Sequence, residues 1–319
     1  MVSLLILAYN EEKNIETTIS SYINNFDEII IVNDSSTDKT KEIIENINKK
    51  NEALTIINNS KNYGAGKSFQ IGINHFLKSE STYLIKIDGD GQFNKEDILN
   101  IKTLVESNKN FDLIKCDRFW SEGIIGNIPT VRYIGNIFAS ILIKFSTGFK
   151  EINDPLNGLF LISNKLAKNI DVPKIFYRYG YPFYLIILAT SLSLKNNIKI
   201  GQIKNTVTYG FSESKLRPSI MLLKLIFFSL KSYLKKIRNK INYSELQTSF
   251  AIDLISLLFL SGTIYQLIRF IKIRFFESVG SQSAWFTVFI IFAFLTVLLF
   301  RTSLKIENRI FTKYFEELN

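Results

Sequence analysis

Two carboxylates one residue apart, Asp88 and Asp90, follow the strand-type stretch at residues 85–87. An Asp-x-Asp pair at the end of a buried strand can place both carboxylates on one divalent cation. The adjacent Gly89 and Gly91 let the backbone approach a diphosphate closely, because glycine has no Cβ. The pattern therefore predicts a site for a nucleotide-sugar and its metal ion. Taken alone it also fits an ordinary turn, since Asp and Gly are typical turn residues.

The chain is large and apolar enough to bury a core. It has 319 residues, of which 46% are hydrophobic and 13% aromatic, which excludes a disordered chain. Its net charge of +10 is concentrated in residues 215–240, which carry eight Lys or Arg and no acid. These bases alternate with apolar residues, which predicts a membrane-surface helix and no nucleic-acid partner. The bases that share one helical face are Lys224, Lys231, Lys235 and Arg238.

Cysteine and histidine are too scarce for several kinds of site. The single cysteine, Cys116, ends an apolar run and is expected in the core, so a disulfide framework and a thiolate metal cluster are excluded. The single histidine, His75, has no acidic or Cys partner nearby in sequence, which argues against zinc and Ser-His-Asp chemistry. The apolar residues 2–8 are too short for a signal peptide, so the N-terminal domain is expected in the cytoplasm.

The elements that must position the carboxylates are short strands that alternate with helices. Over the first 120 residues, β-branched runs alternate with amphipathic segments, which predicts βαβ units and a parallel sheet. A strongly apolar helix from Ile134 to about Gly148 is expected to lie against lipid. The strands are expected at residues 3–8, 28–33, 54–57, 83–87, 112–116, 159–163 and 206–210.

Two apolar runs near the C-terminus have about the length of a bilayer crossing. Residues 249–268 contain one charged residue, Asp253, and residues 284–300 contain none. We interpret them as transmembrane helices with both termini in the cytoplasm; the alternative is two buried core helices. The predicted division is a catalytic domain at 1–218, a basic amphipathic segment at 219–248 and a two-helix membrane region with a short cytoplasmic tail at 249–319.

Three further polar segments follow predicted strands, where a parallel sheet binds its ligands. They are LAYNEEKN at 7–14, VNDSSTDKT at 32–40 and NYGAGKSFQIG at 62–72. Together with the Asp-x-Asp pair, they resemble in order and spacing the nucleotide-binding half of the family 2 glycosyltransferases. The resemblance implies an α/β fold, namely an A-type (Rossmann-like) glycosyltransferase domain, here followed by an amphipathic interface helix and two transmembrane helices.

The resemblance also implies a role for each matching residue. Ala8, Tyr9 and Glu11 would line the base and ribose pocket, and Asp34 would accept hydrogen bonds from the base or ribose. Asp88 and Asp90 would face the diphosphate and a Mg²⁺ or Mn²⁺ ion, with Gln92 as a further metal ligand. Asn33 departs from the pattern, because many relatives carry a second Asp there.

Gly66 and Lys67 begin the glycine-rich helix and are candidates for binding the nucleotide. With Ser68 they look like the end of a P-loop, whose backbone amides and lysine would surround phosphates. Lys61 stands where that motif requires a glycine, so the P-loop pattern fails.

The second half of the catalytic region narrows the resemblance to one branch. Arg118 and Arg132 lie fourteen residues apart, and the stretch 131–160 contains the sequence NDPLNG with Asp154. This looks like the polyprenyl- or dolichyl-phosphate sugar transferases, in which two such arginines bind the lipid phosphate and Asp-Pro-x-Asn-Gly closes the catalytic pocket. Residues 178–186 lack the acids that relatives often carry there, and the Gln-x-x-Arg-Trp pattern of processive synthases is absent.

The expected reaction is inverting transfer of a sugar from a nucleotide-sugar to a polyprenyl phosphate at the cytoplasmic face of a bacterial cytoplasmic membrane. Asp90, Arg118, Arg132 and Asp154 are the candidate catalytic residues. A lipid phosphate is already an anionic nucleophile, so a strong general base is dispensable. One alternative is transfer to a lipid-linked glycan or another hydroxyl, with Asp154 as the base. The other is a membrane-anchored nucleotide-binding protein without activity.

Overall fold

The computed structural model describes residues 1–49, 54–107, 109–119, 124–125, 128, 130–208, 218–275 and 282–318. Most of the segment 207–218, expected to precede the membrane helices, lies outside this part of the chain, and so does most of the loop between Arg118 and Arg132. Two compact units are present: Met1–Ser229 together with Tyr314–Asn319, and Leu230–Lys313.

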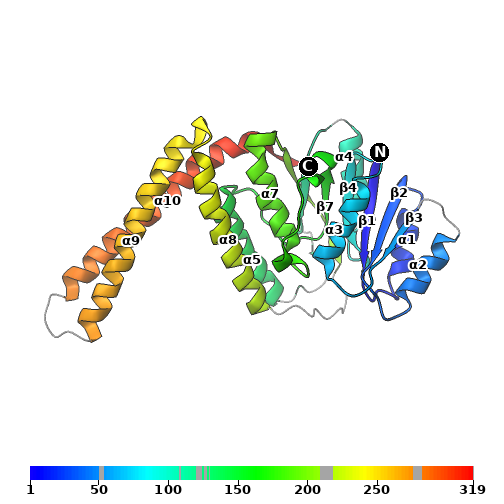
Figure 1. Ribbon diagram of the computed structural model, residues 1–319, viewed down its shortest axis with the longest axis horizontal. Coiled ribbons are helices and arrows are strands. Elements are labelled where there is room, and N and C mark those ends of the chain that lie inside the picture. The colour runs from blue at the N-terminus through cyan, green and yellow to red at the C-terminus, as the bar shows by residue number, and fades with distance from the viewer. Residues whose placement is uncertain are drawn as a thin grey trace. The chain divides into compact units, whose positions relative to one another are not determined.

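The first unit is built on a mixed sheet. Eight of the described strands form it in the order β10-β8-β5-β7-β4-β1-β2-β3. Figure 1 labels the strands from β7 to β3. β7 is antiparallel to its neighbours β4 and β5, and the other pairs are parallel. The strands are β1 Val2–Ala8, β2 Glu28–Asn33, β3 Leu54–Asn58, β4 Tyr83–Asp88, β5 Leu113–Asp117, β7 Phe160–Ser163, β8 Ile200–Lys204 and β10 Phe315–Leu318; β6 Ile124–Ile125 and β9 Val207–Thr208 form a separate pair.

Helices cover both faces of this sheet. β1 is buried along its whole length, which explains its uninterrupted apolar sequence. On one face its residues Leu4 and Ile6 join Ile19 and Ile98 in the main core. On the other face Leu5 contacts α3, where a Cβ on Gly72 would lie 2.6 Å from Leu5 Cδ1. The helices are α1 Ile15–Tyr22, α2 Thr40–Asn48, α3 Ala65–Phe76, α4 Lys95–Glu106, α5 Thr130–Thr147, α6 Asn164–Ala167, α7 Tyr181–Asn196, α8 Pro218–Lys240, α9 Gln247–Phe275 and α10 Gln282–Phe311, with 3₁₀ turns at Lys174–Phe176, Ser244–Leu246 and Thr312–Tyr314.

The strands expected from the sequence are present where the structure describes them. β2 has the expected bounds, and β1, β3, β4, β5 and β7 differ by one residue at one or both ends. β10 was not expected, because its sequence FEEL is short and polar. It pairs in parallel with β8 at the sheet edge, and Leu318 is buried in the core. The predicted three-part division of the chain stays a prediction.

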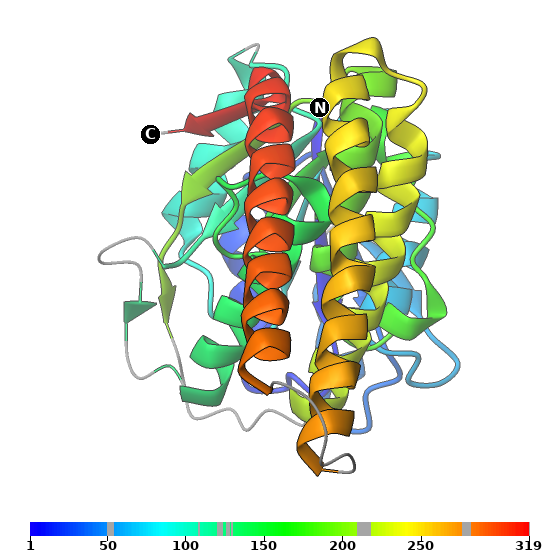
Figure 2. The same cartoon turned by 90° about the vertical axis from the view of Figure 1, so that its left-hand side faces the viewer.

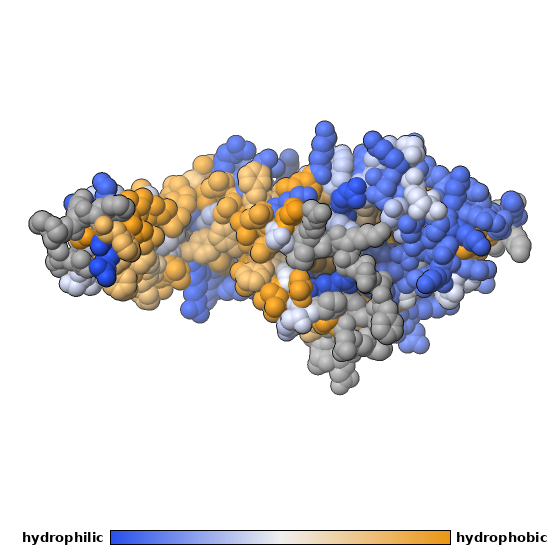
Figure 3. Space-filling view, turned by 90° about the horizontal axis from the view of Figure 1, so that it is seen from below, coloured by the Kyte–Doolittle hydropathy of each residue, from blue (hydrophilic) through white to orange (hydrophobic). Residues whose placement is uncertain are grey.

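α9 and α10 pack side by side and could each span a membrane (Figures 1 and 2). Only 11% and 0% of their most apolar windows is buried, which disagrees with the alternative of two core helices. The face seen in Figure 3 is largely apolar in this region, and Leu258 and Phe294 are 71% and 65% exposed. The helices contact closely at Gly262, where a Cβ would lie 2.5 Å from the Phe292 ring.

A buried group of charges joins α8 to these two helices. Lys240 forms ion pairs with Asp253 of α9 and Glu307 of α10. Lys236 pairs with Glu307 at 2.7 Å. Two lysines of the basic segment are therefore internal, and Asp253 is paired inside the protein. Other α8 side chains are exposed and apolar, among them Leu223, Phe227, Leu230 and Leu234, in agreement with an amphipathic helix.

Candidate active site

The loops after β1 and β2 hold each other at the carboxyl edge of the sheet. Ala8 is buried and Tyr9 is 38% exposed. The side chain of Asn10 accepts a hydrogen bond from a backbone N–H of the second loop at 2.8 Å. The Glu11 N–H donates to Oγ1 of Thr40, also at 2.8 Å. Of the three residues predicted to line a base and ribose pocket, Ala8 thus ends β1, and Tyr9 and Glu11 belong to the loop that hydrogen-bonds to the second loop.

Asp34 organises the segment that leads into α3. Its Oδ1 accepts hydrogen bonds from Asn59 Nδ2 at 2.8 Å and from the Tyr63 N–H at 2.9 Å. Its Oδ2 accepts from the Gly64 N–H at 2.7 Å. Asp34 is buried, and each of its oxygens has a partner within the chain. Its proposed contact with the nucleotide stays a prediction beside this observed structural role.

The start of α3 is occupied by the protein itself. A Cβ on Gly66 would lie 2.1 Å from the carbonyl oxygen of Phe176, so a close backbone approach requires glycine. The Lys67 N–H donates to the carbonyl oxygen of Tyr177 at 3.0 Å, and its Nζ lies 5.2 Å from the Tyr177 ring centre. This packing agrees with the failed P-loop pattern. Nucleotide binding by Gly66 and Lys67 stays a prediction.

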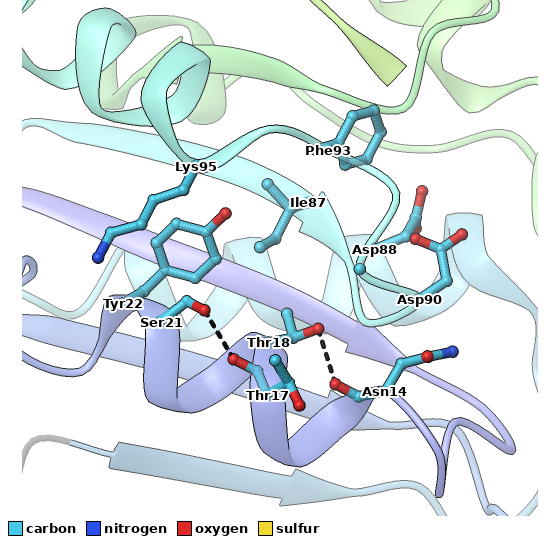
Figure 4. Close-up of a pocket in the computed structure, with 11 residues that line it drawn as sticks. Asn14, Thr17, Thr18, Ser21, Tyr22, Ile87, Asp88, Asp90, Phe93 and Lys95 are labelled. Atoms are coloured by element: carbon cyan, nitrogen blue, oxygen red, sulfur yellow. Dashed lines mark hydrogen bonds between the residues drawn. The ribbon is translucent and has the colours of Figure 1, made fainter. Parts of the chain in front are cut away.

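Asp88 and Asp90 lie together at the end of β4 (Figure 4). Nζ of Lys86 is 2.6 Å from Oδ1 of Asp88. The Gln92 N–H donates to Oδ1 of Asp90 at 3.2 Å. Burial and then the charge of Asp88 raise the pKa of Asp90 to about 7. Burial also raises the pKa of Glu11, and the negative charge of Asp88 adds to this rise. The acids thus form a site of excess negative charge.

Arg118 and Asp154 form an ion pair across 36 residues of sequence. Nε of Arg118 is 2.8 Å from Oδ2 of Asp154, and its Nη2 donates to Oδ1 at 3.2 Å. The Asp154 side chain is fully buried, whereas that of Arg118 is 16% exposed. Both carboxylate oxygens therefore lie close to one guanidinium, and one of them accepts a hydrogen bond from it.

Arg132 lies in the first turn of α5 and is partly exposed. Its neighbour Tyr133 contacts Phe119, the residue after Arg118, with ring centres 5.6 Å apart. The start of α5 and the end of β5 are therefore adjacent. The two predicted phosphate-binding arginines come from these adjacent segments.

The Asp-Pro-Leu-Asn-Gly segment at 154–158 links the arginine to the carboxylates. It begins with Asp154, which pairs with Arg118, and ends with Gly158, where a Cβ would lie 2.6 Å from Oδ2 of Asp88. Between them Asn157 donates from Nδ2 to the Cys116 carbonyl at 3.0 Å. One loop thus touches both groups of candidate site residues.

Comparison with known proteins identifies the fold and family. The model of the family described as Glycosyl transferase family 2 matches residues 3–152. An uncharacterized protein of Methanocaldococcus jannaschii is 31% identical over 173 residues, which cover 52% of this chain and 73% of the relative. The chain belongs to glycosyl transferase family 2. The resemblance inferred from its motifs is confirmed, and the protein is a glycosyltransferase.

Two further proteins resemble this glycosyltransferase over most of their length. The UDP-N-acetylglucosamine–dolichyl-phosphate N-acetylglucosaminyltransferase of Methanococcus voltae is 26% identical over 244 residues, which cover 72% of this chain and 94% of the relative. The crystal structure of glucosyl-3-phosphoglycerate synthase from Mycobacterium tuberculosis, in complex with Mn²⁺, UDP and phosphoglyceric acid, has a TM-score of 0.53 at 16% identity. It covers 73% of this chain and 78% of that one. This structural likeness confirms the predicted A-type fold.

The carboxylates of the glycosyltransferase fit a divalent cation bound together with a diphosphate. Among the described residues, no group of three His, Cys, Asp or Glu side chains converges as a complete metal site. Mg²⁺ is commonly held by one or two carboxylates plus substrate phosphates. Asp88 and Asp90 supply such a pair, and the raised pKa of Asp90 marks negative charge that a cation would compensate.

A cavity of about 240 Å³ adjoins the two acids (Figure 4). Its wall comes from α1, including Thr18 and Tyr22, and from β4 with the segment that follows it, including Phe93. Ala8, Tyr9 and Asp34 are not among its lining residues. The cavity therefore lies on the α1 side of Asp88 and Asp90, beside the loops that carry the predicted nucleotide-binding residues.

Sequence reasoning missed two buried lysines of this glycosyltransferase. Burial alone would lower the pKa of Lys86, but the charge of Asp88 and the contact with Tyr181 outweigh it and raise that pKa. Burial lowers the pKa of Lys115 to about 8. The available signal was a lysine inside each of two otherwise apolar strands, LIKID and LIKCD. Cys116 is buried as predicted, and burial raises the pKa of its thiol.

Proposed function

We propose that this glycosyltransferase transfers a sugar from a nucleotide-sugar to a polyprenyl phosphate, with inversion at the anomeric carbon. The observation that carries the proposal is the loop 154–158, which contacts Arg118 at one end and Asp88 at the other. A phosphate held by the arginine and a diphosphate near the carboxylates would then lie side by side. The Methanococcus voltae relative, whose name describes transfer to dolichyl phosphate, supports the same substrate class.

The donor half consists of the loops at the carboxyl edge of the sheet. Ala8, Tyr9, Glu11 and Asp34 bind the nucleoside, and Gly66 and Lys67 lie at the adjacent helix start. Asp88, Asp90 and Gln92 hold Mg²⁺ or Mn²⁺. When bound, this ion supplies positive charge that stabilises the departing nucleoside diphosphate. Asp90 is the acid on which this function depends most, because burial and the charge of Asp88 both raise its pKa, and a bound cation would offset these effects.

The acceptor half binds the lipid phosphate through Arg118 and Arg132. A guanidinium presents paired N–H donors and keeps its charge at any physiological pH. Asp154 orients the Arg118 guanidinium through their ion pair and through the hydrogen bond from Nη2 to Oδ1. The bound phosphate oxygen attacks the anomeric carbon, and the nucleoside diphosphate leaves. Because that oxygen is already anionic, the reaction proceeds without a strong general base.

The Arg118–Asp154 pair favours this acceptor over a hydroxyl. A hydroxyl acceptor needs a base, and Asp154 was the candidate for that role. Its carboxylate is fully buried and paired with the Arg118 guanidinium, so it is not open to an acceptor hydroxyl. We therefore assign Asp154 to positioning. The alternative of an inactive nucleotide-binding anchor is set aside by the family to which the chain belongs.

The two long apolar helices of the second unit agree with a reaction at a membrane surface. A polyprenyl phosphate keeps its phosphate at the membrane surface, and α9 and α10 could both cross the bilayer. After Lys313 the chain returns to the catalytic sheet as β10. Two crossings would therefore begin and end on the side of the catalytic unit. We place that side in the cytoplasm, since the larger basic excess precedes the first crossing.

The experiment that tests this function is a transfer assay with the full-length protein in detergent. UDP-, GDP- and dTDP-sugars are offered in turn with Mn²⁺ or Mg²⁺ and a short-chain polyprenyl phosphate. We expect one donor to give a glycosylated polyprenyl phosphate, with no product in EDTA. Consumption of a donor without any lipid product, or full activity in EDTA, would reject the proposed acceptor or the proposed metal ion.

A further inference from the structure

Two buried lysines flank one phenylalanine beneath the active site. Lys86 of β4 and Lys115 of β5 both pair in register with Phe160 of the intervening β7. Their Nζ atoms lie 6.0 Å and 5.2 Å from the centre of the Phe160 ring. Both residues are 0% exposed. Since a buried ammonium is costly without a partner, each lysine is expected to serve a particular neighbour.

The partner of Lys86 is the first acid of the Asp-x-Asp pair. Its Nζ is 2.6 Å from Oδ1 of Asp88 and 5.5 Å from the centre of the Tyr181 ring. The Lys86 side chain is 1% exposed and that of Asp88 is 36% exposed. The ammonium is therefore enclosed while the carboxylate faces the site. In the active site, the charge of Asp88 is therefore paired with that of Lys86.

This pairing weakens the site for a free divalent cation. A cation bound to Asp88 would lie about 2.1 Å from a carboxylate oxygen whose group also contacts the Lys86 ammonium, so two positive charges would repel at short range. Glu11 adds negative charge near the two acids, but among the described residues no group of three His, Cys, Asp or Glu side chains is placed to hold a metal ion. A diphosphate would supply both the missing negative charge and further oxygen ligands.

We propose that Lys86 is a positioning residue that keeps the Asp88–Asp90 site too weak for a divalent cation alone, so that cation and nucleoside diphosphate bind together. The inference rests on the proposed function in one respect, that the donor carries a nucleoside diphosphate. Lys86 fixes Oδ1 of Asp88, and Gly158 lies against Oδ2. The acid is thus oriented before either ligand arrives.

Lys115 provides a matched control. It is equally buried, lies on the same face of the sheet and flanks the same ring. Its Nζ donates to the carbonyl oxygen of Asn157 at 2.6 Å. Loss of Lys115 therefore removes a buried lysine of the same kind without removing the charge paired with Asp88.

The test measures Mn²⁺ binding to the full-length protein in detergent by electron paramagnetic resonance of free Mn²⁺. Wild type, Lys86→Met, Lys86→Arg and Lys115→Met are titrated without nucleotide, then with UDP or GDP. We expect wild type to bind Mn²⁺ alone weakly and at least about ten-fold more tightly with the diphosphate. Lys86→Met should bind Mn²⁺ alone with an affinity at least about ten-fold higher than that of wild type, because a repelling charge is gone.

The same loss should weaken binding of UDP or GDP in EDTA, since the removed charge attracts an anion. The affinities for Mn²⁺ and for the nucleotide should therefore change in opposite directions. If Lys86 only supported the fold, its loss would weaken the binding of both. Lys86→Arg and Lys115→Met should keep the wild-type Mn²⁺ affinity. Should Lys86→Met not fold, Lys86→Gln removes the charge and keeps a hydrogen-bond donor.

The inference is overturned if the folded variant without the charge binds Mn²⁺ no more tightly than wild type. It is also overturned if wild type binds Mn²⁺ equally well with and without the diphosphate. Failure of wild type to bind any nucleoside diphosphate would reject both this inference and the proposed function. The measurement needs no acceptor, so absence of transfer to polyprenyl phosphate would reject the proposed acceptor while the Mn²⁺ result stands.

Discussion

At the residue scale, the pKa of Asp90 is strongly raised by its position in the site. Its pKa is raised from 3.8 to about 7, first by burial and then by the charge of Asp88. The folded state therefore holds a proton between these pH values that the unfolded chain has released. Stability falls as the pH rises through this window, and the loss is complete above about pH 7.

Asp90→Asn should remove this loss. In EDTA at pH 8 the variant should be more stable than wild type by up to about 4 kcal/mol, and the difference should vanish towards pH 4. Transfer activity should nevertheless fall by at least about a hundred-fold if the acid holds the metal ion. Thermal unfolding at several pH values measures the first effect. Asp27→Asn, at an exposed acid, is the control and should change neither. A variant with full activity would show that Asp90 is not a metal ligand.

Substitutions of Arg132 test the proposed acceptor site. Arg132→Ala should weaken the apparent affinity for polyprenyl phosphate by roughly ten-fold or more, because about 1.5–3 kcal/mol of charge-assisted hydrogen bonding is lost. The apparent donor affinity should barely change. Arg132→Lys should restore part of the affinity, since it keeps the charge and loses the paired donors. Titration of a short-chain acceptor at saturating donor measures both, and equal acceptor dependence in all three proteins would contradict the assignment.

At the scale of elements, apolar runs in the sequence predicted most of the strands. Contacts between polar side chains could not be predicted in this way. The uninterrupted run of β1 and the run of β2 can hardly be anything but buried parallel strands, so their bounds were nearly right. The Arg118–Asp154 pair could not be predicted, because the two residues are 36 apart and periodicity does not pair loops. Lys86 stood in a predicted strand, but the sequence could not show that its ammonium turns towards Asp88.

The loop 154–158 is the element on which the two halves of the site depend. Gly158→Ala would bring a Cβ to 2.6 Å from Oδ2 of Asp88 and 3.3 Å from Nζ of Lys86, so the loop or the acid must move. We expect transfer to fall by about ten-fold or more, since small misplacements of reacting groups are costly. Gly135→Ala in α5 meets no atom within 4 Å and should raise the unfolding free energy by about 1 kcal/mol.

These two glycine variants are compared by transfer assay and thermal unfolding. Wild-type transfer by a folded Gly158→Ala would show that contact between the loop and Asp88 is dispensable.

At the scale of the whole molecule, the chain leaves the catalytic unit after Ser229 and rejoins it with β10. The sequence predicted the two apolar helices from their length and lack of charge. It did not predict β10, because the four residues FEEL carry too little pattern to identify an edge strand. Residues 315–318, within the predicted tail, pair with β8 in the sheet.

Leu318→Ala should therefore destabilise the catalytic unit. The side chain is buried and packs against Gly201, where a Cβ would lie 2.9 Å from Leu318 Cδ1. A loss of about 2–3 kcal/mol in unfolding free energy is expected for a buried leucine. Glu317→Ala, at an exposed position of the same strand, should have little effect. Thermal unfolding measures both variants, and equal stability would mean that β10 adds nothing to the core.

A competition assay between two acceptors decides whether the acceptor is a lipid phosphate. The full-length protein receives its preferred nucleotide-sugar with an equimolar mixture of short-chain polyprenyl phosphate and a neutral glycolipid. We expect nearly all of the sugar on the polyprenyl phosphate, and we expect Arg118→Ala to reduce that product by about ten-fold or more. Faster transfer to the neutral glycolipid, unaffected by Arg118→Ala, would contradict the account and return Asp154 to the role of a base.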